Sequence, residues 1–240
     1  MAGMEKAKER KIRMSGALAI FAKTPSLSPV KTRLSASIGV PLAQEFYKLS
    51  VAAVAEIAKE VQRNSTLTPY WALAEKEAVE LPQWQEFKNI WTGEGGLGAR
   101  LHNIYSSLHK KHDYVMLIGT DSPQLEPELL VGAATKISEQ PESCFIGPAT
   151  DGGFYLFAAK VPIPRNIWTD VTYSNNTTLH ELSGQLAKYN IPVNLLSTQG
   201  DVDTANDIWP LMQGLEQNRN LLPTQKKLYD WLQNQTAIFN

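Results

Sequence analysis

The sequence predicts an α/β domain whose sheet is mixed but mostly parallel, with helices on both faces. Short apolar runs of strand length alternate with longer segments whose apolar residues recur at helical spacing. One run, Tyr114–Ile118, is almost entirely apolar, which is typical of a central strand buried on both faces. The 240 residues contain no internal repeat or linker-like stretch. We therefore expect a single domain over residues 16–240, preceded by a basic tail of residues 1–15.

The expected elements follow in order along the chain. The first strand is apolar and ends at Lys23, where a loop with two prolines begins. The first long helix begins at Pro41, because proline suits the first turn of a helix. The expected strands are Ala17–Ala22, Thr68–Leu73, Phe87–Trp91, Tyr114–Ile118, Cys144–Ile146, Phe154–Ala159 and Val193–Leu196. The expected helices are Pro41–Arg63, Arg100–Lys110, Glu126–Ser138, Asn175–Tyr189, Thr204–Met212 and Thr224–Gln235.

Composition excludes several classes of function. The net charge of −1 argues against a general nucleic-acid or anionic-membrane surface, which would need an excess of basic residues. No segment is long and apolar enough for a membrane span, and the apolar run before Lys23 is too short for a signal peptide. Cys144 is the single cysteine, which excludes an intramolecular disulfide and suits a reducing cytosol. We expect a cytoplasmic protein.

Polar and charged residues gather where the expected strands end. In open α/β sheets, ligands bind at the carboxyl ends of the strands. Lys23 begins the basic loop after the first strand, and Asp121 follows the central strand in GTDSP. Asp151 lies in the loop GPATDGG, and the last strand leads to GDVDT at 200–204. These four loops define a candidate site at one edge of the sheet.

The basic loop FAKTPSLSPVKTRL, residues 21–34, carries the cations Lys23, Lys31 and Arg33. Lysine offers a compact charge and arginine a rigid fork, so together they can hold a diphosphate at several oxygens. The prolines restrict the loop and partly position its charges. A solvated surface loop is the alternative interpretation.

Asp121 is a candidate ligand of a divalent metal. A carboxylate directly after a buried strand needs a partner, and Mg²⁺ prefers one or two protein carboxylates together with phosphate oxygens and water. Alternatively, Asp121 caps the next helix. The loop 200–204 could supply a second ligand, and spacing alone leaves Asp201 and Asp203 open.

Two glycine-containing loops could approach a ligand closely. The glycines after Asp151 allow close backbone approach, but this motif by itself favours the alternative of a tight turn between two strands. The segment TGEGGLGARL, residues 92–101, opens a helix, so its free amides could meet a ribose or a base edge. It is not a phosphate-binding Walker loop, because no Gly-Lys-Ser/Thr follows.

Taken in order, the motifs FAKTPSLSPVKTRL, GGLGARL, GTDSP, GPATDGGFYLF and DVDTAND resemble those of a bacterial family. This is the family of nucleotide-diphospho-sugar-transferase-like proteins of GT-A type, also called glycosyltransferase A or selenodomain-associated transferases. The motifs span residues 21–207 and are similar to those of phospholactate guanylyltransferases and molybdenum-cofactor nucleotidyltransferases. Departures include Ser28 for a glycine and Tyr173-Ser174 for a tryptophan–serine pair. The resemblance implies a single-domain, Rossmann-like GT-A fold.

The resemblance also implies roles for individual residues. Asp121, with Asp203 as the second carboxylate, would hold Mg²⁺ or Mn²⁺, and Asp151 would face the transferred group or act as a base toward the acceptor. The nucleotide phosphates would contact Lys23, Lys31 and Arg33. The base and ribose would lie near Gly95, Gly96, Leu97, Gly98 and Arg100.

From these roles we expect a transferase that moves a sugar from a nucleotide sugar to a small soluble acceptor. The first alternative is nucleotidyl transfer, in which a phosphorylated metabolite attacks a nucleoside triphosphate and pyrophosphate leaves. The second is a nucleotide-binding protein without catalysis.

Overall fold

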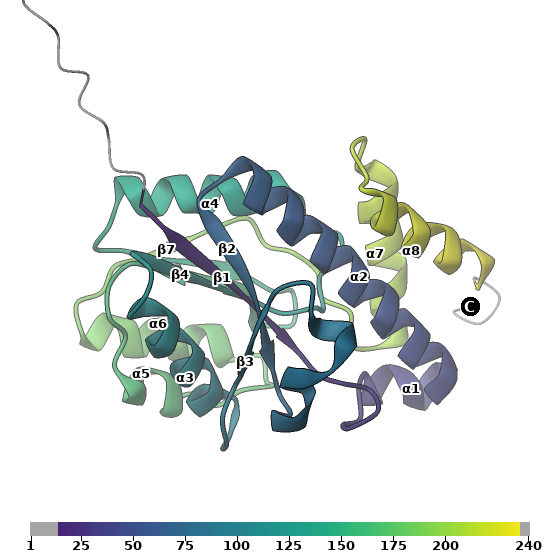
Figure 1. Cartoon of the computed structure of the whole chain (residues 1–240), viewed down its shortest axis with the longest axis horizontal. Helices are drawn as coiled ribbons and strands as arrows, with labels where there is room; N and C mark the ends of the chain where they lie inside the picture. The colour runs from purple at the N-terminus through teal and green to yellow at the C-terminus, as the bar shows by residue number, and fades with distance from the viewer. Residues whose placement is uncertain (1–13, 236–240) are drawn as a thin grey trace, which may run out of the picture.

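A computed structural model describes residues 14–235 of the chain (Figure 1). The predicted basic tail, residues 1–15, lies outside the described residues except for its last two. In the described part, one sheet of seven strands has the order β3-β2-β1-β4-β6-β5-β7. The strands are β1 Gly16–Ala22, β2 Leu67–Leu73, β3 Lys88–Trp91, β4 Tyr114–Ile118, β5 Cys144–Pro148, β6 Phe154–Ala159 and β7 Val193–Leu195.

The sheet is mixed, as predicted, because one strand runs against the others. β6 pairs antiparallel with both β4 and β5, whereas the remaining pairs are parallel. The turn GPATDGG allows this reversal by joining β5 directly to β6 without a crossover helix. The α-helices are α1 Thr32–Ile38, α2 Val40–Asn64, α3 Leu97–His109, α4 Pro127–Glu139, α5 Arg165–Thr169, α6 Thr178–Lys188, α7 Ile208–Gln217 and α8 Pro223–Asn234.

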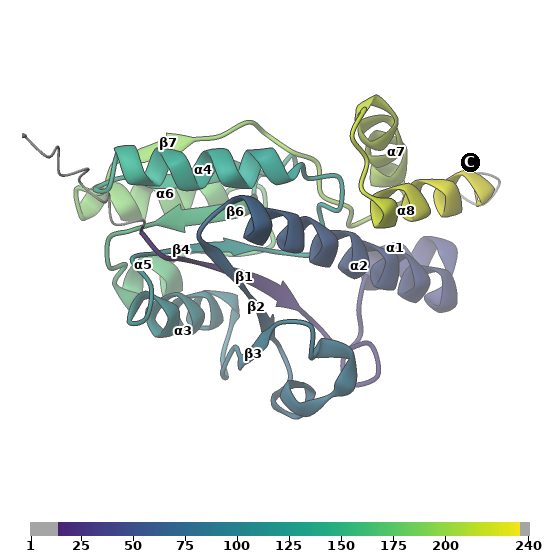
Figure 2. The same ribbon diagram turned by 45° about the horizontal axis from the view of Figure 1, so that its top comes forward.

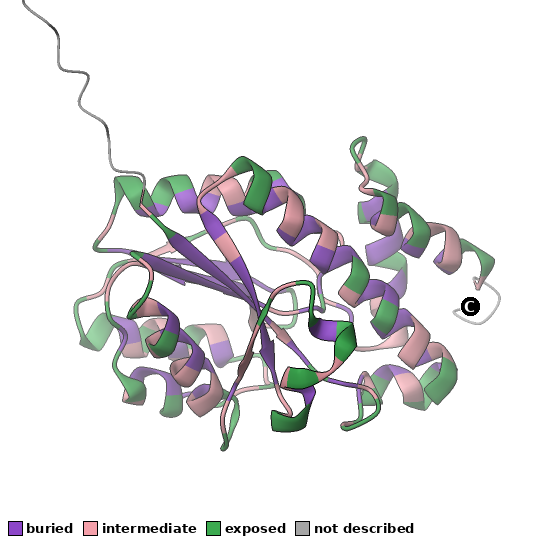
Figure 3. Ribbon diagram, in the orientation of Figure 1, coloured by how far each residue is buried: buried purple, intermediate pink, exposed green. Residues whose placement is uncertain are grey.

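Helices cover both faces of the sheet. Alternation along β1 directs Leu18 and Ile20 to the layer of α2 and α4, and Ala17 and Ala19 to the layer of α3, α5 and α6. The central strands are mostly buried, which Figure 3 shows as purple, and β4 is buried along its whole length. This double cover explains the apolar sequence of β4.

A third apolar cluster lies at one end of the molecule. α7 and α8 pack against α1 and the beginning of α2 there, beyond the end of the sheet (Figure 2). Leu34, Phe46, Leu211 and Leu228 are among its buried members. This packing fixes the positions of α1 and of the loop that precedes α7, and both carry predicted site residues.

The strands agree with the predicted ones to within a few residues, but short elements were missed. The helix α1 has only Leu34 and Ile38 buried, and α5 has five residues, so neither offers a readable period. Two 3₁₀ turns, Lys76–Glu80 and Pro82–Trp84, lie between β2 and β3. No helix within residues 14–235 combines the length and apolarity that crossing a membrane requires.

The beginnings of two helices bear on interpretations made from the sequence. Thr204 and Asp207 form a capping box, with the Asp207 carboxylate accepting from the Thr204 amide at 2.7 Å, and this box begins a 3₁₀ turn at Ala205–Asp207. The helix α7 follows this turn, so it begins at Ile208 rather than Thr204. The N-cap of α4 is Glu126, which removes the alternative that Asp121 caps that helix.

Candidate active site

A cavity of about 870 Å³ lies at the carboxyl ends of β1 and β4. It contains six of the residues that the sequence analysis placed in a site, drawn from loops far apart in the chain. Two further predicted residues, Leu97 and Arg100, also line it, whereas Gly95, Gly96 and Gly98 do not. The six are Lys23, Lys31, Arg33, Asp121, Asp151 and Asp203.

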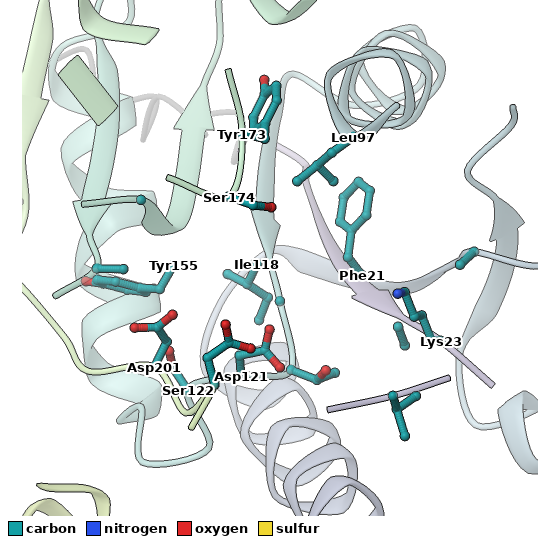
Figure 4. Close-up of a pocket in the computed structure, with 18 of the residues that line it drawn as sticks. Phe21, Lys23, Leu97, Ile118, Asp121, Ser122, Tyr155, Tyr173, Ser174 and Asp201 are labelled. Carbon is teal, nitrogen blue, oxygen red and sulfur yellow. The ribbon is translucent and has the colours of Figure 1, made fainter. Parts of the chain in front are cut away.

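The backbone of Lys23 is bonded to a side chain of α2, whereas its ammonium group faces the cavity. The Tyr47 hydroxyl accepts from the Lys23 amide at 2.8 Å and donates to the Lys23 carbonyl at 2.9 Å. Burial raises the pKa of Tyr47 well above its usual value, so the hydroxyl stays protonated and can donate. The Lys23 ammonium points toward the cavity (Figure 4) and has no bonded partner among residues 14–235. It is therefore available to an anion.

The Lys31 ammonium is bonded to oxygen atoms of the protein and is not exposed in the cavity as a phosphate ligand would be. Its backbone is left-handed, with φ 47° and ψ 47°, which is uncommon for a residue other than glycine. The ammonium bonds Asp121 Oδ1 at 2.5 Å and also bonds the Val202 carbonyl. Its side chain is 4% exposed, compared with 57% for Asp121. Lys31 thus ties three loops together and places a fixed positive charge under the cavity.

Arg33 forms an ion pair at the rim. Its Nη1 lies 2.6 Å from Asp203 Oδ2, and the two side chains are 62% and 46% exposed. Exposed ion pairs contribute ~1 kcal/mol or less, so this one can open when an anion arrives. Arg33 can exchange its carboxylate partner for a phosphate.

Asp201, which the sequence left as an alternative to Asp203, lies among the carboxylates of the cavity. Burial, together with the negative charges of Asp151 and Asp121, raises its pKa to about 6. In Figure 4, Asp121 lies between Asp201 and Lys23. Asp151 directs one oxygen to its own turn, accepting from the Gly153 amide at 2.7 Å.

This arrangement fits a divalent cation bound by few protein ligands. Like charges gather at Asp121, Asp151 and Asp201, and Lys31 offsets only one of them. Within the described residues, however, no three His, Cys, Asp or Glu side chains are close enough to form a complete metal cluster. A divalent cation bound by these carboxylates would take its remaining ligands from a bound phosphate and from water, as Mg²⁺ usually does in proteins.

The glycine-rich segment, residues 92–101, mainly allows close packing between elements and contributes few residues to the cavity. A Cβ at Gly98 would lie 2.2 Å from the Trp168 carbonyl oxygen, so glycine permits α3 to approach α5. Arg100 donates to the carbonyls of Gly95 at 3.0 Å and Ala74 at 2.8 Å. Leu97 faces Phe21 across an apolar part of the cavity (Figure 4).

The sequence analysis missed two hydroxyls of α2 that hold the site loops. Tyr47 binds the backbone at Lys23, and Ser50 Oγ donates to the Thr120 carbonyl at 2.5 Å. They lie three residues apart on the buried side of the helix, so both reach loops at the same sheet edge. The sequence feature that could have identified them is a pair of hydroxyl-bearing residues among the apolar positions of an amphipathic helix.

The sheet order, the single reversed strand and the cavity at the carboxyl ends define a protein with the fold of GT-A-like nucleotide-diphospho-sugar transferases. The chain belongs to the family DUF2064, described as an uncharacterized protein conserved in bacteria, whose profile matches residues 53–175. Both the predicted fold class and the predicted resemblance are confirmed.

Solved structures support the fold over nearly the whole chain. A protein of Desulfovibrio desulfuricans G20, provisionally named a nucleotide-diphospho-sugar transferase, is 23% identical with a TM-score of 0.78, covering 94% of this chain and 97% of its own. The 4-diphosphocytidyl-2C-methyl-D-erythritol synthase of Anaerococcus prevotii DSM 20548 is 9% identical with a TM-score of 0.54, covering 85% and 99%. A cytidylyltransferase of Leptospira borgpetersenii is 11% identical with a TM-score of 0.53, covering 95% and 97%. A search of curated proteins gave no match.

Proposed function

We propose that the protein transfers a sugar from a nucleotide sugar to a small acceptor with the help of a divalent cation. The observation that carries the proposal is the convergence of Lys23 and Arg33 with Asp121 and Asp201 on one cavity. Basic groups beside carboxylates suit a diphosphate with its bound metal ion. The provisional name of the Desulfovibrio protein supports a nucleotide-sugar donor.

The donor would lie along the β1 side of the cavity. Lys23 has a free ammonium, and Arg33 can leave Asp203, so both are placed to contact the phosphates. The apolar surfaces of Phe21 and Leu97 would accept the base. Lys31 would act on the phosphates through its fixed charge next to Asp121 rather than by direct contact alone.

Asp121 and Asp201 would hold the cation. Asp203, the second ligand expected from the sequence, has its carboxylate on Arg33 at the rim, whereas Asp201 faces the other carboxylates. Mg²⁺ or Mn²⁺ bound there would stabilise charge developing on the leaving diphosphate. Asp151, whose second oxygen stays free of the turn, would accept the proton of the acceptor.

Nucleotidyl transfer is the second candidate, and the fold shared with two cytidylyltransferases favours it. The by-product separates the two reactions. Sugar transfer releases a nucleoside diphosphate, whereas nucleotidyl transfer from a triphosphate releases pyrophosphate. We also propose a cytosolic location, which suits a chain whose single cysteine, Cys144, forms no intramolecular disulfide.

The test is a panel of nucleotide sugars and nucleoside triphosphates with Mg²⁺ or Mn²⁺, followed by chromatography of the nucleotide products. We expect a nucleoside diphosphate from one nucleotide sugar, and Asp121→Asn to lower that turnover by about 100-fold or more, the usual loss for a group that stabilises developing charge. Asp230→Asn is the matched control, because Asp230 pairs with Lys226 on α8 outside the cavity. Unchanged turnover in Asp121→Asn contradicts the shared site. Binding of a nucleotide with no turnover of any donor would favour a non-catalytic protein.

A further inference from the structure

The cavity has two chemically different sides. Lys23 and Phe21 of β1 and its loop lie on one side with Leu97, whereas Tyr155 and Asp201 lie on the other, with Asp121 between them (Figure 4). The first side belongs to the donor under the proposed function. The second, which we call the acceptor wall, comprises the lining residues of 149–155, 173–178 and Asp201.

We propose that the acceptor is an uncharged, hydroxyl-rich molecule, a polyol or a sugar, that reacts through a hydroxyl oxygen and is not a phosphate or carboxylate. This inference rests on the proposed function and adds the class of acceptor to it.

The distribution of charge excludes an anionic acceptor. Among the described residues, every Lys or Arg lining the cavity lies on residues 23–33 or on α3, and the charged members of the acceptor wall are Asp151 and Asp201. The cation proposed at Asp121 and Asp201 would be engaged by the donor diphosphate, so a phosphate seated on the wall would meet the Asp151 carboxylate with no lysine or arginine beside it. A phosphate and a neighbouring carboxylate repel each other strongly in a cavity, because the surrounding protein screens charge less than water does. A neutral molecule avoids this repulsion.

The polar groups of the wall suit hydroxyls. The Ser174 hydroxyl points into the cavity (Figure 4). Asn175 Oδ1 accepts from Thr177, from its amide at 2.9 Å and its hydroxyl at 2.8 Å. The side-chain amide nitrogen of Asn175 has no bonded partner within the described residues, so it can donate to a ligand. With the second oxygen of Asp151, the wall offers both hydrogen-bond donors and hydrogen-bond acceptors. A hydroxyl group can use both, because its proton donates and its oxygen accepts.

The wall is built rigidly. Gly152 has φ 89°, and a Cβ there would lie 2.3 Å from the Asn176 carbonyl oxygen, so the turn 149–153 presses against the loop 174–177. The Gly152 carbonyl accepts from the Leu179 amide at 3.0 Å and so ties the turn 149–153 to the first turn of α6, which follows the loop 174–177. Ser174 has a left-handed backbone, φ 62°, which surrounding structure must enforce in a residue other than glycine. Groups fixed in advance lose little entropy on binding, so they can select an acceptor.

The transfer balances with the groups present. The acceptor oxygen forms a bond to the anomeric carbon of the sugar, and the bond from that carbon to the diphosphate oxygen breaks. The electron pair of the broken bond leaves with the nucleoside diphosphate, and the hydroxyl proton goes to the Asp151 carboxylate.

The test compares matched acceptors on the unaltered protein, with the nucleotide sugar that it turns over. We would use glycerol against glycerol 3-phosphate and glucose against glucose 6-phosphate, and measure glycoside formation by mass spectrometry. We expect the neutral member of a pair to be preferred at least 10-fold in kcat/KM. A preference for the phosphorylated member overturns the inference and leaves the proposed function standing. Pyrophosphate release from a nucleoside triphosphate, with no sugar transferred, overturns both.

A variant that adds a positive charge to the acceptor wall tests the preference for neutral acceptors independently. Asn175→Lys places a cation on the acceptor wall, so we expect the preference for the neutral member to fall by about 10-fold. The control Asn220→Lys adds the same charge in the exposed loop between α7 and α8, outside the cavity, and should leave the preference unchanged. An equal change in both variants, or none in Asn175→Lys, contradicts the inference.

Discussion

Asp201→Asn should stabilise the metal-free protein at neutral and alkaline pH. Asp201 is partly buried among other carboxylates, and its pKa in the folded protein is about 6, above the ordinary value of 3.8. A carboxyl group with a raised folded pKa favours the folded state at low pH, and this contribution is lost as the pH rises from about 4 to about 6. Above that window, the folded protein must hold a charge that the unfolded chain carries more easily. Asparagine has nearly the same shape and no charge, so it removes the penalty.

The two pKa values set the size of the effect. They differ by about 2, and each unit corresponds to about 1.4 kcal/mol, so the full penalty above pH 6 is ~3 kcal/mol. Asp201 keeps some contact with solvent, so we expect about half to all of this value as a gain in the free energy of unfolding. For a domain of this length, that gain raises Tm by about 3–12 °C.

Differential scanning calorimetry with a chelator at pH 8 and pH 4 measures the effect. The variant should melt above the parent protein at pH 8 and together with it at pH 4. Asp203→Asn is the matched control two residues away, because it removes a carboxylate that already pairs with Arg33, and it should give no gain. Equal Tm values for Asp201→Asn and the parent protein at pH 8 would refute the idea that uncompensated charge gathers at this position.

Three further variants test how the loops around the cavity are held, and one of them, Lys23→Met, is a control. Tyr47→Phe leaves the Lys23 amide and carbonyl without their hydroxyl partner, so we expect a loss of about 1–3 kcal/mol in urea unfolding together with a raised KM for the donor. An unchanged KM would show that Tyr47 supports folding alone. Lys31→Met removes the bonds to Asp121 and the Val202 carbonyl and should lower the free energy of unfolding by about 1–3 kcal/mol, whereas Lys23→Met, whose ammonium has no bonded partner among the described residues, should not. Equal losses in the two lysine variants would contradict the tethering role of Lys31.

The strands were predictable because each carries its own signal. β4 is apolar along its length since both faces are covered, and β1 ends where Lys23 interrupts the apolar run. The missed helices α1 and α5 are seven and five residues long. Elements of that length complete too few turns to show a period, and packing against neighbours determines them instead.

The members of the site were predictable because strand ends gather at one edge of a sheet, but their pairings were not. Nothing in the spacing of GDVDT distinguishes Asp201, which joins the carboxylates, from Asp203, which meets Arg33 at the rim. Lys31 and Lys23 likewise look equivalent in the sequence. One ammonium is buried against Asp121 and the other faces the cavity, because the left-handed backbone at Lys31 redirects its side chain.

The class of fold, the order of the strands along the chain and the loops that carry the acidic and basic residues could all be predicted from the amino-acid sequence. These properties follow from local patterns of apolar residues and from the rule that strand ends share an edge. The tertiary structure alone decided which charges neutralise one another and which remain exposed to a ligand. Such pairing depends on distances of a few ångströms between segments that lie up to 171 residues apart, such as Lys31 and Val202, and no local pattern encodes them.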